Sequence, residues 1–184
     1  MTRPISHPAR DSVHRPPGAG LVQPVAAVLT DRLDDVAVAE AAARMALARR
    51  VPLLLIAVMP PHVRRSAGPA SAPVRAVLAR VMPKVGPHPT GRIPEVFHLP
   101  VGRGSRLAAA KELLALAGRH RAPDVLASRH GPHGIDAHTL IEAAALRGGP
   151  FVHAVAPASW VPLQPSAPPA ADRPSGSWRG NVSR

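Results

Sequence analysis

The sequence predicts an α/β domain with an open, parallel five-stranded sheet and helices on both faces. Two observations carry this prediction. Short continuous apolar runs recur along the middle of the chain, and longer Ala- and Leu-rich segments separate them. Short apolar runs bounded by turn residues are typical of strands buried on both faces, whereas the longer segments follow helical spacing. Strands that alternate with helices form a parallel sheet because each crossover returns the chain to the same edge.

The elements follow one another in a regular order. Strands are expected at 25–30, 51–58, 95–99, 124–128 and 151–156, and helices at 36–49, 74–85, 107–117 and 137–146. Asp34 or Asp35 can cap the first helix, and the acids at its start and bases at its end match the helix dipole. The pair Pro60-Pro61 stops the second strand, Ser105 is expected to cap the third helix, and Gly148-Gly149 closes the fourth.

The two ends of the chain differ from its middle. Residues 1–23 and 161–184 are Pro-rich and polar and lack apolar periodicity. Such segments bury too little apolar surface to offset the entropy of ordering, so both are expected to be disordered tails. The predicted organisation is therefore an N-terminal tail at 1–23, an α/β domain at 24–160 and a Pro-rich C-terminal tail at 161–184.

The composition excludes several classes of protein. The 184 residues include no Cys, which excludes disulfides, thiolate nucleophiles and Cys-based zinc sites. The first residues hold no apolar stretch like that of a signal peptide, and the longest apolar run, 51–61, is far shorter than a membrane span. A cytoplasmic protein without membrane contact is expected.

The charge indicates a second kind of function. The net charge is +12 and nearly all basic residues are Arg, an excess that an anionic partner would explain. The basic residues are spread out, however, and the densest groups are pairs such as Arg49-Arg50 and Arg64-Arg65. This spread argues against specific nucleic-acid binding. A basic interaction protein that binds nucleic acid or an acidic protein partner remains the alternative function.

The motifs that carry chemistry are weak. His130, His133, Asp136 and His138 are residue types that ligate metals, but they lie in a Pro- and Gly-containing loop without a helical His-x3-His pair. Loop histidines without a metal are the preferred interpretation. The segment 102–105, Gly-Arg-Gly-Ser, lacks the remaining residues of a phosphate loop or dinucleotide fingerprint. Because a nucleophile elbow is also missing, we expect no catalytic residues and no enzyme.

The order of the segments resembles a known family. Residues 25–61 run strand, acid-containing turn, Ala-rich helix, strand and double Pro, and residues 107–155 run helix, His-Arg-Ala-Pro-Asp, strand, Ser-Arg-His-Gly loop, helix, Gly-Gly-Pro and strand. Over 24–157 this resembles the universal stress protein family, most specifically at 124–131 and 149–152. The resemblance implies a Rossmann-like or flavodoxin-like fold and a non-catalytic regulatory or ligand-sensing domain, often a homodimer joined through the last strand. Many members bind ATP.

The resemblance also implies where a nucleotide would bind. Family members that bind ATP use a Gly-x2-Gly-x9-Gly-[Ser/Thr] loop after the fourth strand, an Asp at the end of the first strand and a Val at the end of the second. Carried over, the two glycines are Gly131 and Gly134, the strand-one acid falls at Thr30 or Asp31, and the Val is Val58. Arg129 would balance phosphate charge. The implied nucleotide-binding residues are therefore Asp31, Val58, Arg129, Gly131 and Gly134.

The last part of this loop departs from the family pattern. Aligned back from Pro150, the family's Gly-Ser pair falls at Ala137-His138, so a glycine and a hydroxyl that would approach phosphate are missing. Thr139 could still offer a hydroxyl. The sequence therefore predicts a divergent member with an incomplete loop, which binds an adenine nucleotide weakly or not at all. ATP is the one candidate cofactor.

Overall fold

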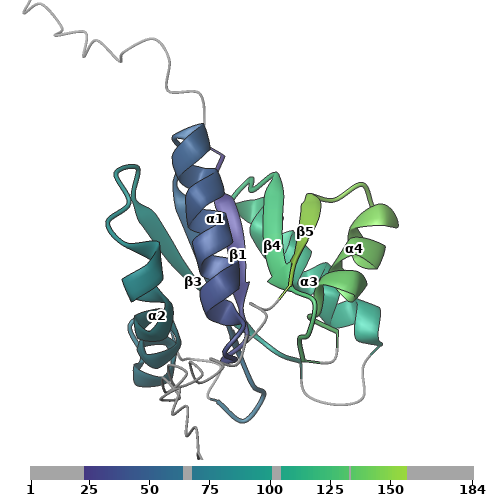
Figure 1. Cartoon of the computed structure of the whole chain (residues 1–184). Helices are drawn as coiled ribbons and strands as arrows, with labels where there is room; N and C mark the ends of the chain where they lie inside the picture. Colours follow the sequence, from purple (N-terminus) through teal and green to yellow (C-terminus); the bar gives the residue numbers. More distant parts are fainter. Residues whose placement is uncertain (1–22, 64–67, 101–104, 133, 157–184) are drawn as a thin grey trace, which may run out of the picture.

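The computed structural model describes residues 23–63, 68–100, 105–132 and 134–156. Its elements alternate as the sequence predicts (Figure 1). They are β1 Val25–Leu29, α1 Asp35–Arg49, β2 Leu53–Met59, α2 Ala72–Val85, β3 Arg92–His98, α3 Arg106–Arg119, β4 Asp124–Ser128, α4 Ala137–Ala145 and β5 Phe151–Val155. Apart from residue 23, the two predicted tails lie outside the described residues.

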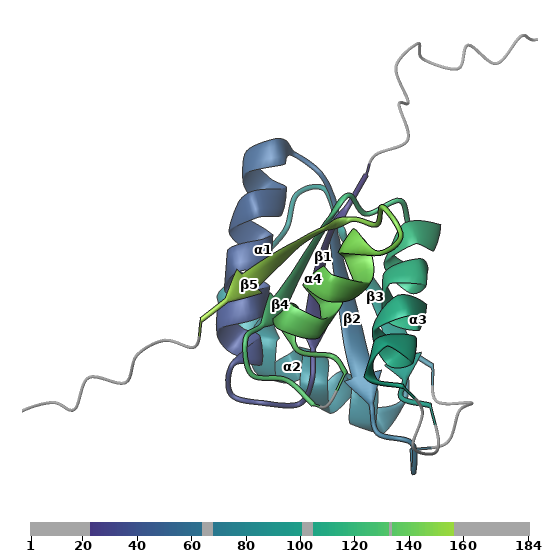
Figure 2. The same ribbon diagram turned by 90° about the vertical axis from the view of Figure 1, so that its right-hand side faces the viewer.

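The five strands form one parallel sheet in the order β3-β2-β1-β4-β5. Helices α1 and α2 pack on one face of this sheet, and α3 and α4 pack on the other (Figures 1 and 2). The predicted fold class is confirmed. The strand order reverses direction between β1 and β4, and this is the point at which open α/β sheets bind ligands at the carboxyl ends of their strands.

The core is built from small and branched aliphatic side chains. Every residue of β1, β2 and β4 is buried. Because side chains alternate along a strand, Ala26 and Val28 pack with α3 and α4, whereas Val25, Ala27 and Leu29 pack with α1 and α2. The continuous apolar runs of the sequence therefore reflect a sheet covered on both faces.

Strand β3 is longer than predicted. It begins at Arg92 rather than at residue 95, and it contains Pro94. Proline lacks the N–H of a ladder hydrogen bond and is excluded from central strands, but β3 pairs with β2 alone and forms an edge of the sheet. The sequence pattern predicted a loop through Pro94, because the sequence does not indicate which strands lie at the edges of the sheet.

Two of the predicted helix caps differ in the structure. Asp34 holds the N-cap position of α1 without a capping hydrogen bond, and Asp35 is buried and accepts from the amides of Thr30 at 2.8 Å and Arg32 at 3.0 Å. Asp35 therefore fixes the β1–α1 turn. Ser105 holds the predicted N-cap position of α3, but its side chain makes no cap hydrogen bond.

Candidate functional site

The switch point between β1 and β4 is bridged by side chains. The hydroxyl of Ser128, at the end of β4, donates to Asp34 Oδ2 at 3.0 Å. The same hydroxyl accepts from the backbone N–H of His130 at 3.1 Å. These contacts hold the β1–α1 turn against the β4–α4 loop at the position where such folds bind ligands.

The two residues expected to hold the nucleoside make different contacts. Asp31 has φ of 62° and its half-exposed carboxylate pairs with Arg80 of α2 at 2.6 Å, on the α1–α2 side. Val58 is only 3% exposed and packs in the cluster under α3 and α4. Leu29 pairs with Ala57, so the residue that comes level with Val58 is Thr30, the other candidate for the strand-one position.

The two loop glycines are required by the packing of the protein itself. A Cβ on Gly131 would lie 2.9 Å from the backbone of Asp136. Gly134 has φ of +86°, and a Cβ there would lie 2.7 Å from the carbonyl oxygen of Arg106, at the start of α3. Both glycines thus let the β4–α4 loop pack against its neighbours, and protein backbone fills the space beside them.

The start of α4 carries its own anion. Asp136 is the N-cap residue, and its carboxylate accepts from the backbone N–H of Thr139 at 3.0 Å and from the Thr139 hydroxyl at 2.7 Å. Burial alone would raise the pKa of Asp136, but these hydrogen bonds outweigh it and hold the pKa below its usual value. Amides at a helix N-terminus are where a phosphate would bind. Here a carboxylate takes that place.

Sequence reasoning treated Asp136 only as a potential metal ligand and Thr139 only as a spare hydroxyl. An Asp directly before an apolar helical pattern is an N-cap signal, and it would have identified this arrangement. Thr139 is buried and its hydroxyl is already bonded to Asp136, so it is not available to a ligand.

Arg129, between β4 and Gly131, contacts the last strand of the sheet. Its backbone N–H donates to the carbonyl of Val155 at 3.0 Å, which places it beside β5. It lines a pocket with His138, Ile141 and other residues of α4 and β5. A separate hollow is formed by Asp31, Arg32, Leu33, Asp34 and Arg80.

The histidine loop does not form a metal site in the part of the chain that the structure describes. No group of three or more metal-ligating side chains gathers there. His130 and His138 are exposed, and Asp136 is committed to Thr139. His133 and the Gly-Arg-Gly segment at 102–104 lie outside the described residues.

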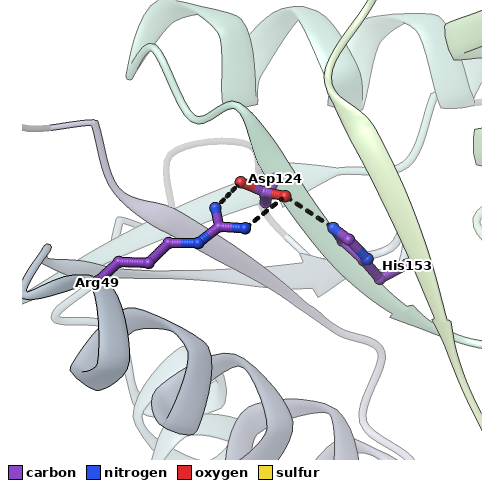
Figure 3. Close-up of polar contacts among 3 residues, drawn as sticks. All are labelled: Arg49, Asp124 and His153. Carbon is purple, nitrogen blue, oxygen red and sulfur yellow. Dashed lines mark hydrogen bonds and ion pairs between the residues drawn. The ribbon is translucent and has the colours of Figure 1, made fainter.

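A polar cluster that the sequence analysis missed lies at the opposite edge of the sheet. Asp124, at the start of β4, is buried and bonds both to the guanidinium of Arg49 and to Nε2 of His153, the latter at 2.7 Å (Figure 3). Burial opposes ionisation of this carboxyl, but Arg49 and then His153 lower its pKa below the usual value. The cluster ties α1, β4 and β5 together. Its members are far apart in sequence, and no local motif signals it.

The fold and its switch point define an open, doubly wound α/β domain. Solved structures that resemble it include a universal stress protein family member from Burkholderia pseudomallei, with a TM-score of 0.52 and 16% identity, covering 77% of this chain and 100% of that one. A universal stress protein from Archaeoglobus fulgidus has a TM-score of 0.46 and 14% identity, covering 72% and 93% of the two chains. The chain has the universal stress protein fold, as its sequence resemblance predicted.

Sequence comparison adds no closer relationship. No protein-family model matches the chain, and no curated protein matches it. Among the described helices, none has the length and apolar character needed to cross a membrane.

Proposed function

We propose that the chain is a non-catalytic regulatory domain with the universal stress protein fold, in which the chain's own carboxylate takes the place of nucleotide phosphate. The observation that carries this proposal is the double hydrogen bond from Thr139 to Asp136 at the start of α4. The domain would then act without a bound nucleotide, through contacts with other macromolecules.

Three physical effects oppose nucleotide binding. An ionised Asp136 repels a phosphate at the helix N-terminus and already uses the amide of Thr139. The Arg106 carbonyl occupies the space beside Gly134, and a carbonyl oxygen also repels an anion. Asp31 is already paired with Arg80 of α2, whereas Val58 packs in the cluster under α3 and α4. We therefore expect ATP, ADP and AMP to bind no more tightly than about 1 mM, roughly −4 kcal/mol.

The polar contacts at the switch point do not make a catalytic triad. Ser128, His130 and Asp34 are residue types of a nucleophile, a base and an orienting acid. However, His130 contacts the Ser128 hydroxyl through its backbone N–H, and that hydroxyl donates directly to Asp34. A general base must reach the proton of the nucleophile with its side chain. This geometry supports a structural role, in which these contacts link the β1–α1 turn to the β4–α4 loop.

We further propose that the domain pairs with a second copy through β5. This strand is an edge of the sheet, so its outer backbone groups are unpaired by the sheet itself. Phe151 at its start is 77% exposed, and it borders an apolar pocket with Ile141 of α4. An edge strand beside exposed apolar side chains is suited to strand pairing between identical chains.

Isothermal titration of the full chain with ATP, ADP and AMP in the presence of magnesium tests the nucleotide part of the proposal. The expected result is no saturable heat below about 1 mM ligand. Binding in the micromolar range would overturn it.

A further inference from the structure

The amino-terminal edge of the sheet is strongly basic. In a parallel sheet with crossover helices, the starts of all strands and the ends of all helices lie at the same edge, here the upper edge in Figure 1. The basic side chains that this arrangement gathers come from the ends of α1 to α4 and the turns after them, and from the start of β3. They are Arg49, Arg50, Lys84, Arg92, Arg119, Arg121 and Arg147.

The charge excess of the described residues is confined to this basic edge. Its one carboxylate, Asp124, is buried and already paired with Arg49 and His153 (Figure 3). The remaining described residues carry seven cations and eight carboxylates, a net charge of −1. Their cations are Arg32, Arg44, Arg75, Arg80, Arg106, Lys111 and Arg129, and their carboxylates are Asp31, Asp34, Asp35, Glu40, Glu95, Glu112, Asp136 and Glu142.

Hydrogen bonds join the loops of the basic edge into one surface. The hydroxyl of Thr90 donates to the carbonyl of Val51 at 2.6 Å, which connects the turn before β3 to the turn before β2. The N–H of Phe151 donates to the carbonyl of Pro123 at 2.8 Å, which connects the turns before β4 and β5. Neighbouring strands lie about 4.8 Å apart, so the edge spans about 19 Å across the five strands.

Two of these arginines occupy backbone positions that favour glycine. Arg50 has φ of 55° and Arg121 has φ of 56°, both in the left-handed region, and both residues are exposed. A residue with a Cβ costs about 1 kcal/mol there relative to glycine. Helix dipoles explain a cation in a last helical turn, but four helix ends supply only about half a negative charge each. Seven cations exceed what the dipoles require.

We propose that the basic edge binds the phosphate backbone of double-stranded nucleic acid without reading its sequence. Arginine forks match phosphate geometry and remain charged at every physiological pH. Single strands are bound largely by stacking on aromatic rings, and Phe151 is the one exposed aromatic side chain among the described residues. The other large apolar side chains exposed near this edge are Leu47 and Leu146, and Leu is under-represented among the anchors of protein interfaces. The proposal does not depend on the nucleotide site.

Fluorescence anisotropy of the full chain with a labelled DNA duplex of about 20 base pairs, over a series of salt concentrations, tests this inference. The informative variant is Arg50→Gly with Arg121→Gly, since glycine relieves the backbone at both positions and the variant should melt no lower than the wild type. The matched control is Arg44→Gln with Arg75→Gln, which removes the same charge from α1 and α2 away from the edge.

The wild type is expected to bind the duplex with an affinity that falls steeply with salt. The glycine variant should lose at least about tenfold in affinity at about 0.1 M salt, and the slope of log affinity against log salt should become shallower by about 2. The control should change affinity by less than about threefold. Terminal segments also carry Arg, so the difference between variants, rather than the absolute affinity, reports on the edge.

Three results would overturn the inference. The first is no duplex binding at low salt. The second is an equal loss in the glycine variant and the control, which would mean that only net charge matters. The third is a preference for another ligand, seen either as tighter binding to a single strand than to the duplex or as binding to polyglutamate that the duplex does not displace. Either preference would assign the edge to a different partner.

Discussion

Asp136 is first a helix cap, and its effect on stability can be measured separately from ligand binding. Replacement by Ala removes the acceptor for the Thr139 amide and hydroxyl, and should lower the free energy of unfolding by about 1 kcal/mol. Asp136→Ser keeps a good N-cap and should cost much less. Urea denaturation of the three proteins checks this. An equal loss of unfolding free energy in both variants would mean that the capping hydrogen bond contributes little to stability.

The lowered pKa of Asp136 predicts a pH dependence with a definite sign. Because its folded pKa lies below its unfolded value, near 3.9, the carboxylate adds stability that is fully present above that value and is lost as the pH falls through the folded pKa. Asp136→Asn should therefore lose less stability than the wild type between about pH 5 and pH 2. Parallel stability curves for the two proteins over this range would contradict the assignment.

Gly134 can be compared with Gly148, which has a similar backbone conformation but different neighbours. Gly134 and Gly148 both have positive φ, yet a Cβ would collide with the Arg106 carbonyl only at Gly134 and would meet open space at Gly148. Gly148→Ala should cost about 1 kcal/mol, and Gly134→Ala roughly 2 kcal/mol or more. Thermal unfolding measures the difference. An equal loss of stability in the two variants would show that the β4–α4 loop can move away from Arg106, and would contradict the close packing at Gly134.

At the scale of elements, the edge strand β5 predicts a change of oligomeric state. Phe151→Lys places a charge at the start of the proposed pairing strand and should convert a dimer to a monomer. Leu33→Lys is the matched control, because Leu33 is 86% exposed in the β1–α1 turn at the carboxyl end of the sheet, whereas Phe151 begins β5 at the amino end. Light scattering after gel filtration gives the mass of each. A wild-type monomer, or a dimer that survives Phe151→Lys, would refute pairing through β5.

The elements themselves were largely predictable because local residue patterns fix them. Continuous apolar runs located β1 and β4 to within a residue, since both strands are buried on both faces. The start of β3 was not predictable, because Pro94 is tolerated only at a sheet edge and edge position is decided by strand order. The capping hydrogen bond at Ser105 was not predictable for a similar reason. Residue type indicates that a side chain can cap a helix, but the orientation of the chain decides whether the hydrogen bond forms.

At the scale of the whole molecule, the candidate site was harder to predict than the fold. The sequence places Asp31 and Val58 at neighbouring strand ends, but it does not show that Asp31 turns toward Arg80 of α2 while Val58 packs under α3. The cluster of Arg49, Asp124 and His153 joins positions up to 104 residues apart in sequence through tertiary structure alone. The basic edge likewise exists only because the topology gathers four helix ends.

The central claim, that Asp136 takes the place of nucleotide phosphate, is tested most directly by thermal denaturation of the full chain with and without millimolar ATP and magnesium. A ligand that binds only the folded state raises its melting temperature. The predicted result is no ATP-dependent rise for the wild type, and no smaller response for Asp136→Asn, which removes the charge but keeps an acceptor for Thr139. A clear rise for the wild type would contradict the claim.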